Sequence, residues 1–131
     1  MAFVSVTRLR LRSWLYLPLF LRHAIPSSQQ SMAAPGNLKT FTRQQRFSVF
    51  WTLTVWQDET SMRNYMRSGA HREAMPKLAE WCDEASTVHW HQEGIEPPSW
   101  EEATRRMLAE GRLAPVQHPS ANHAAGIILD C

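Results

Sequence analysis

Hydrophobic and polar residues recur along the chain with two periods, and these periods predict its secondary structure. Alternation with the period of a strand predicts strands over residues 2–11, 38–44, 47–56 and 86–92, and apolar spacing with the period of a helix predicts helices over residues 13–33, 58–85 and 99–110. Asp58 is the expected N-cap of the second helix, and Gly69 is expected to end or kink that helix. Ser99 with Glu102 fits a capping box at the start of the last helix.

The order of these elements predicts the fold class. A β-α-β-β-α-β succession is typical of the α+β ferredoxin-like fold, a four-stranded antiparallel sheet with its helices on one face. Residues 1–96 are therefore expected to form the ferredoxin-like domain, and residues 97–131 an extra C-terminal helix and an extended tail. The other face of the sheet is apolar and needs a cover. A second copy is the simplest cover, so a homodimer with its sheets facing is expected.

Candidate chemistry gathers around one strand-to-helix junction. Trp51 and Trp56 lie on the strand, and Tyr65 and His71 follow on the helix. Aromatic rings supply apolar walls, a histidine can take or give a proton near neutral pH, and a tyrosine can donate to an oxyanion. Thr7, with Ser5 beside it, is polar on an otherwise apolar strand face, which suggests a ligand-facing spot. The junction therefore predicts a pocket for a small hydrophobic molecule.

Composition and charge limit the other classes of function. Six tryptophans in 131 residues are many, and the net charge is only +2. Residues 1–57 hold seven Lys or Arg and no acid, but the basic residues are spread out, so no nucleic-acid contact is expected. The apolar run WLYLPLFL is far shorter than the roughly 18–20 residues that span a bilayer, and Arg22 ends it, so neither membrane contact nor a cleaved signal is expected.

The cysteines and histidines suggest neither a disulfide framework nor a metal site. Cys82 and Cys131 are too few for such a framework, which favours a cytoplasmic location. His89 and His91 form an HxH pair on one strand face, but no third ligand lies in register with them. No metal site is therefore expected.

The segment TVWQDETSMRNYMRSGAHREAM, together with the order of elements, resembles a known family. Over about residues 2–92 the chain is similar to the antibiotic-biosynthesis-monooxygenase-like proteins of the dimeric α/β-barrel superfamily. The resemblance implies a homodimer that oxidises a hydrophobic or aromatic molecule, without metal or other cofactor. It implies His71 and Tyr65 as catalytic residues, with His71 moving a proton and Tyr65 holding an oxyanion. Thr7, Trp51, Trp56 and Met75 are the residues expected to contact the substrate. Trp51 and Trp56 lie on opposite faces of their strand, and which of them faces the helices stays open.

The haem-degrading branch of that superfamily sets out a different site. It has an Asn on the first strand, a Trp on the second helix and a haem-ligating His after it; the matching positions here hold Thr7, Tyr65 and Met75. Two alternatives to an oxygenase therefore stay open. One is a dimeric module that binds a ligand without turnover, and the other is a haem protein with His71 or Met75 as ligand.

Overall fold

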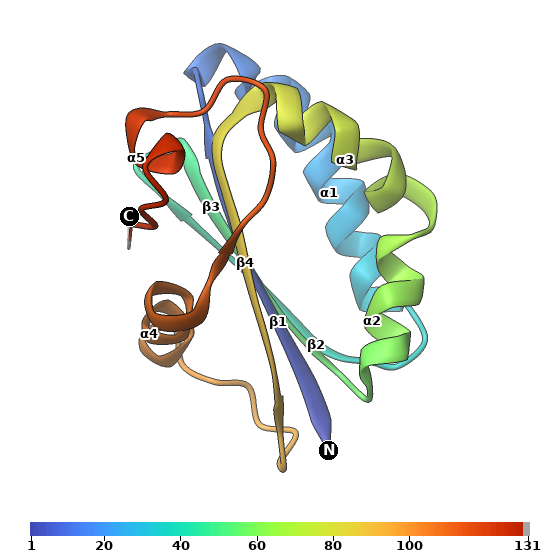
Figure 1. Cartoon of the computed structure of the whole chain (residues 1–131). Coiled ribbons are helices and arrows are strands. Elements are labelled where there is room, and N and C mark those ends of the chain that lie inside the picture. Colours follow the sequence, from blue (N-terminus) through green and yellow to red (C-terminus); the bar gives the residue numbers. More distant parts are fainter. Residues whose placement is uncertain (130–131) are drawn as a thin grey trace.

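The computed structural model describes residues 1–129, and Cys131 lies outside them. The elements along the chain are β1 (Ala2–Leu11), the 3₁₀ helix η1 (Trp14–Tyr16), α1 (Leu17–Ala33), β2 (Asn37–Gln45), β3 (Val49–Trp56), α2 (Glu59–Met66), α3 (Gly69–Trp81), β4 (Cys82–Gln92), α4 (Trp100–Glu110), β5 (Arg112–Leu113) and α5 (Ala121–Ala124). Their order confirms the expected ferredoxin-like α+β fold with an antiparallel sheet (Figure 1).

The sheet has one strand more than expected. Within residues 1–129 its order is β2-β3-β1-β4-β5, so the four-stranded prediction is wrong by the short strand β5. After α4 the chain returns along the free edge of β4, where Leu113 pairs with Ser86 and Arg112 with Thr87. The N–H of Ala114 then donates to the carbonyl of Ala85 at 2.8 Å. A strand of two residues is too short to show alternation, so the sequence pattern does not predict it. It forms because the unpaired edge of β4 favours pairing with another strand.

The predicted helix over residues 58–85 is two helices. Asp58 caps α2 as expected, since its carboxylate accepts from the N–H of Ser61 at 2.8 Å. The chain turns between α2 and α3, and Gly69 begins α3 with a φ of +60°, in the left-handed region that glycine tolerates. The cap at Ser99 is also confirmed, because its hydroxyl accepts from the N–H of Glu102 at 3.1 Å.

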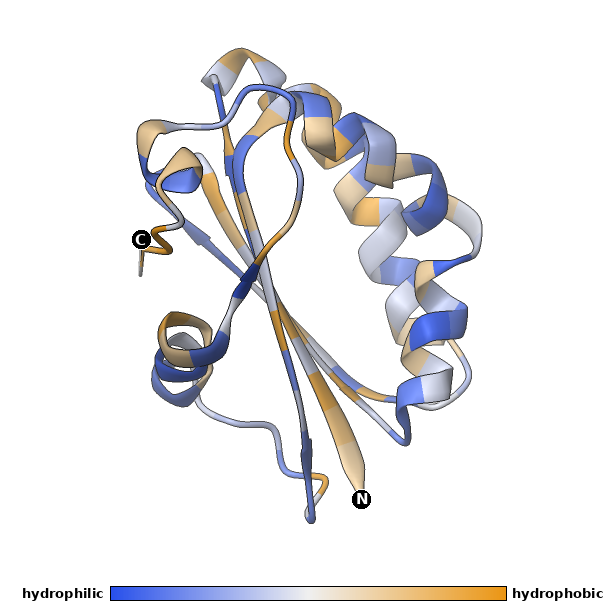
Figure 2. Ribbon diagram, viewed as in Figure 1, coloured by the Kyte–Doolittle hydropathy of each residue, from blue (hydrophilic) through white to orange (hydrophobic). Residues whose placement is uncertain are grey.

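Helices cover both faces of the sheet, whereas helices on one face were expected. α1, α2 and α3 lie on one side, and α4 and α5 on the other (Figure 1). The face opposite α1 packs on the chain's own C-terminal segment in a buried cluster that includes Val4, Val6, Trp51, Leu53, Val88, Trp90, Ala103 and Met107. Hydrophobic residues follow the strands between the two helical layers, while much of α2 and α4 is hydrophilic (Figure 2). The apolar face that was expected to require a second copy is therefore buried within one chain.

Arginine side chains that stack on tryptophan rings connect α4 with the sheet. The guanidinium of Arg43 lies over the rings of Trp51 and Trp100, with distances to the ring centroids of 5.1 and 4.7 Å. Arg106 lies 4.6 Å from the ring centroid of Trp90. Arginine stacks on aromatic faces both as a cation and as a flat apolar surface, so these contacts tolerate partial burial.

A buried ion pair lies on this same side of the sheet. Nη1 of Arg8 donates to Glu84 at 2.8 Å, and the two side chains are almost fully buried. The hydroxyl of Ser120, which also caps α5, donates to the second carboxylate oxygen of Glu84 at 2.7 Å. Sequence alternation placed Arg8 on an apolar face, and the partners that make this possible come from distant parts of the chain.

No helix within residues 1–129 is long and apolar enough to cross a membrane.

Candidate functional site

A cavity of about 550 Å³ lies between the sheet and the helices α1, α2 and α3. Its walls are mostly apolar and include Leu9, Phe20, Leu21, Ile25, Phe50, Met62, Met66, Met75 and Leu78. Ala114 and Pro115, just after β5, also line it. A cavity of this size suits a small organic molecule, since ligand pockets usually measure roughly 300–1,000 Å³.

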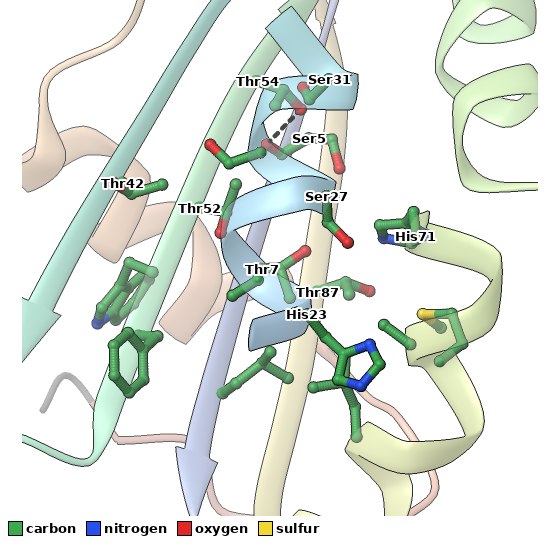
Figure 3. A pocket seen from close by; sticks show the side chains of 18 of the residues that line it. Ser5, Thr7, His23, Ser27, Ser31, Thr42, Thr52, Thr54, His71 and Thr87 are labelled. Carbon is green, nitrogen blue, oxygen red and sulfur yellow. Dashed lines mark hydrogen bonds between the residues drawn. The ribbon is translucent and has the colours of Figure 1, made fainter. Parts of the chain in front are cut away.

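The floor of the cavity is polar. Strand register places Thr40, Thr54, Ser5 and His89 in one row across β2, β3, β1 and β4, and places Thr42, Thr52, Thr7 and Thr87 in the next row. All of these residues except Thr40 line the cavity. In Figure 3 the labelled hydroxyls of Thr7, Thr52 and Thr87 lie on the strands, across from His71. The cavity thus combines an apolar roof with a floor of hydroxyl groups that can donate or accept hydrogen bonds.

Gln30 of α1 positions His71 at the start of α3. The side-chain oxygen of Gln30 accepts from the N–H of His71 at 3.0 Å, and its amide nitrogen donates to the carbonyl of Ser68 at 2.7 Å. A Cβ at Gly69 would lie only 3.0 Å from the Gln30 side chain. Glycine at this position therefore permits both the left-handed backbone and the close approach of Gln30.

The imidazole of His71 has the features of a neutral base. Its Nδ1 lies 3.3 Å from the carbonyl oxygen of Met66. A carbonyl oxygen only accepts hydrogen bonds, so Nδ1 carries the proton in this contact and Nε2 carries the lone pair. Burial lowers the pKa of His71 below its usual value, and the Met66 carbonyl opposes this only partly. The neutral form is therefore favoured near pH 7.

Tyr65 lies beside His71, but its hydroxyl has another partner. The ring centroids of the two residues are 4.8 Å apart. The Tyr65 hydroxyl donates to the carbonyl oxygen of Ser27 in α1 at 3.0 Å, which joins α2 to α1. Burial raises the pKa of Tyr65 to about 12, so the phenol keeps its proton. Since a phenol has one proton to donate, the expected role of Tyr65 as oxyanion donor conflicts with this contact.

The structure brings most of the other predicted site residues to the cavity. Thr7, Met75 and Trp51 line it together with Tyr65 and His71. Trp51 also packs in the buried cluster under α4 and has no exposed surface.

Trp56 is not among the residues that line the cavity, so its predicted substrate contact stays a prediction. It is fully buried with Phe3 and Met62, and its ring centroid lies 5.3 Å from that of Tyr65. Trp56 therefore packs against the ring of Tyr65.

Sequence reasoning missed His23 and most of the hydroxyl floor. His23 of α1 lines the cavity, packs its ring 5.5 Å from that of Trp81, and lies 3.5 Å from the amine of Lys77 through its Nε2. A signal for the floor was present, because Thr52 and Thr54 alternate with apolar residues on the central strand as Ser5 and Thr7 do on the first. Only strand pairing shows that these positions meet on one face.

Among residues 1–129 no group of three or more His, Cys, Asp or Glu side chains could hold a metal ion. His89 and His91 instead flank Phe3, with ring centroids 5.5 and 4.9 Å from its own.

A family model described as "Domain of unknown function (DUF3291)" matches residues 25–113, which is more than half of the chain. No curated protein matches the sequence.

Solved structures resemble the fold closely although their sequences differ. A conserved protein from Methanosarcina mazei Go1 has 19% identity and a TM-score of 0.63, over 71% of this chain and 94% of its own. A putative antibiotic biosynthesis monooxygenase from Nitrosomonas europaea has 15% identity and a TM-score of 0.64, over 75% of this chain and 94% of its own. SnoaB, a cofactor-independent oxygenase from Streptomyces nogalater, has 13% identity and a TM-score of 0.58, over 74% and 98%. The expected resemblance to antibiotic-biosynthesis-monooxygenase-like proteins is thus confirmed for the fold.

Proposed function

The chain belongs to the family described as Domain of unknown function (DUF3291), and we propose that it binds a small hydrophobic or aromatic molecule in the cavity and oxidises it with dioxygen, without a cofactor. The observation that carries the proposal is the state of His71. This residue lines an apolar cavity, its imidazole is neutral, and Nε2 holds the lone pair that can accept a proton. The fold shared with SnoaB, a cofactor-independent oxygenase, supports this reaction class.

The proposed reaction starts with a proton transfer. Nε2 of His71 takes a proton from a methylene carbon that neighbouring aromatic or carbonyl groups have made acidic. The resulting anion is electron-rich enough to reduce dioxygen directly. One oxygen atom becomes the new carbonyl oxygen of the substrate, and the other leaves as water with the two methylene hydrogens.

The hydroxyls of the cavity floor are better placed than Tyr65 to donate hydrogen bonds to the anion. Thr7 and Thr52 face each other in the strand register, and both line the cavity. Fixed donors directed at a developing oxyanion stabilise it most in a site that excludes water. We therefore assign oxyanion binding to this floor, and assign Tyr65 to positioning the wall beside His71.

Oxygen uptake with anthrone, an aromatic ketone that has an acidic methylene, tests the proposal. The wild-type chain should convert it to the diketone faster than buffer, and His71→Ala should lower the rate by about 10²–10⁴-fold, as the loss of a general base does. His118→Ala is the matched control, because His118 is exposed and does not line the cavity. An unchanged rate in His71→Ala would remove the proposed role of His71.

The same assay separates turnover from binding alone. A chain that binds anthrone saturably, measured by tryptophan fluorescence, but consumes no oxygen is a ligand-binding module. In that outcome the hydroxyl floor and apolar walls still define the ligand, and His71 has no chemical role.

Haem binding is a second candidate, favoured by one contact. A metal-ligating histidine usually donates its other ring nitrogen to a carbonyl or carboxylate, and Nδ1 of His71 donates to Met66 in this way. Nε2 of His71 would then be the iron ligand, with Met75 at the wall nearby. Bound haem would supply the activation of dioxygen. A haemin titration tests this: a saturable Soret shift of one haem per chain, lost in His71→Ala or Met75→Ala, would favour the haem protein over the cofactor-free oxygenase.

A further inference from the structure

Two aromatic rings project into solvent at one end of the sheet. Trp14 is 74% exposed and Phe47 is 78% exposed. Trp14 begins η1, just after β1, and Phe47 lies at the tip of the β2–β3 hairpin. The end of β1 is joined to this hairpin by a hydrogen bond from the N–H of Leu11 to the carbonyl of Ser48 at 2.9 Å. Both rings border one open groove of about 640 Å³, which Arg10, Arg12 and Arg46 also line.

The hairpin tip holds Phe47 outward at a conformational cost. Arg46 and Phe47 have φ angles of +49° and +61°, in the left-handed region that disfavours side chains. The turn is held by Gln44, whose side chain donates to the carbonyl of Phe47 at 3.1 Å. A glycine would adopt this turn without strain, so an exposed bulky ring here is a feature that folding alone does not explain.

The groove beside the rings is positively charged. Asp83 neutralises Arg10, since the two side chains form a paired contact of 2.9 and 3.1 Å. Arg12 donates instead to neutral groups, the carbonyl of Glu80 at 2.8 Å and the hydroxyl of Tyr16, and its guanidinium lies 4.5 Å from the Tyr16 ring centroid, so its charge persists. Arg46 is exposed at the hairpin tip. No Asp or Glu occurs in residues 1–57, so neither segment of the groove supplies an acid of its own.

We propose that this patch, made of Trp14, Phe47, Arg12 and Arg46, docks on the surface of an anionic lipid bilayer. Aromatic rings favour the level of the lipid headgroups, and arginines bind the anionic headgroups around them. A second copy of the chain would bring like charges together, which opposes that contact. The proposal departs from the expectation of no membrane contact, and it does not depend on the proposed activity.

The position of the patch connects it with the cavity. β1 runs from the cavity, which Leu9 lines, to the groove beside the patch, which Leu11 lines. Docking would therefore hold one end of the cavity close to the bilayer, where hydrophobic molecules concentrate.

Co-sedimentation of the full chain with lipid vesicles tests the proposal. The chain should bind vesicles of phosphatidylcholine and phosphatidylserine more strongly than vesicles of phosphatidylcholine alone, and added salt should weaken that binding. Trp14→Ala and Phe47→Ala should each lower the partition coefficient roughly tenfold. Arg46→Gln should lower it about fivefold. Ile95→Ala is the control, because Ile95 is also exposed, at 63%, but lies outside the groove, and its loss should change nothing.

Phe47→Gly separates docking from folding. Glycine relieves the left-handed strain and removes the ring, so the urea midpoint should rise while vesicle binding falls.

Three results would overturn the proposal: no preference for phosphatidylserine vesicles, vesicle binding unchanged in the Trp14→Ala, Phe47→Ala double variant, or vesicle binding that Ile95→Ala weakens as much as Phe47→Ala does. Self-association that Trp14→Ala abolishes, or binding to single-stranded RNA without vesicle binding, would assign the patch to another partner and overturn it as well.

Discussion

The hydroxyl of Tyr65 and the carbonyl oxygen of Ser27, 38 positions apart in sequence, form a hydrogen bond of 3.0 Å that joins α2 to α1 across the top of the cavity. Gln30, one turn further along α1, reaches the start of α3 and binds the N–H of His71. α1 therefore positions both Tyr65 and His71, the two residues that the sequence predicts to be catalytic. His71 is held by its backbone N–H and by Nδ1, which leaves Nε2 with the lone pair that the proposed reaction uses.

Tyr65→Phe should weaken the fold more than the chemistry. The variant loses one partly buried hydrogen bond, so the free energy of unfolding should fall by about 1 kcal/mol. Oxidation of anthrone should stay within about tenfold of wild type, because the hydroxyl already binds Ser27. Urea denaturation and oxygen uptake measure the two effects. A loss of rate comparable to that of His71→Ala would return the oxyanion role to Tyr65.

His71 should make stability depend on pH. Burial lowers the pKa of the folded imidazole, so the unfolded chain takes up its proton at a higher pH than the folded chain does. As pH falls through the unfolded value of about 6.5 towards the folded value, the free energy of unfolding should therefore fall. His71→Gln should lose less stability than wild type between pH 8 and pH 5, in roughly that window.

His118→Gln is the control for that experiment, because His118 is exposed. Its pH profile of urea midpoints should follow the wild type. Profiles of wild type and His71→Gln that stay parallel over the window would show that His71 is not desolvated in the folded chain.

The buried pair of Arg8 and Glu84 should be costly to break. Glu84→Gln removes the charge between Arg8 and Ser120, and a broken buried pair costs about 3–5 kcal/mol. Glu59→Gln breaks the exposed pair with Arg63 and should cost no more than about 1 kcal/mol. Urea denaturation of both variants at pH 7 gives the comparison. Equal losses would mean that solvent reaches the Glu84 site.

The packing of α4 on the sheet should contribute a large part of the free energy of unfolding. Met107 is fully buried against the sheet, so Met107→Ala should lower the free energy of unfolding by about 2–5 kcal/mol. Leu108 is the neighbouring control; it is 48% exposed, and Leu108→Ala should change stability by about 0.5 kcal/mol or less. A small loss in Met107→Ala would place α4 elsewhere than on the sheet in solution.

Removal of residues 97–131 should change the association state. The truncated chain would expose Val6, Trp51 and Leu53, a patch too apolar to stay in water. Analytical ultracentrifugation should show it in larger assemblies than the full chain forms at the same concentration. A homodimer of the full chain remains a prediction, and it now needs a contact other than the face that α4 covers. A truncated chain that stays monomeric and folded would contradict this account of α4.

The sequence by itself determined what depends on local interactions. Alternation placed Ser5 and Thr7 on one face of β1, and short-range hydrogen bonds made Asp58 and Ser99 helix caps, since each needs only neighbours within a few positions. Only the tertiary structure decided the partner of the Tyr65 hydroxyl, the row that Thr7 shares with Thr52 and Thr87, and the burial of Trp51 under Met107. These contacts join distant segments, and no periodicity within one segment encodes the position of another, so the pocket's polar floor and the cover of the sheet emerge only when the strands pair and α4 folds back.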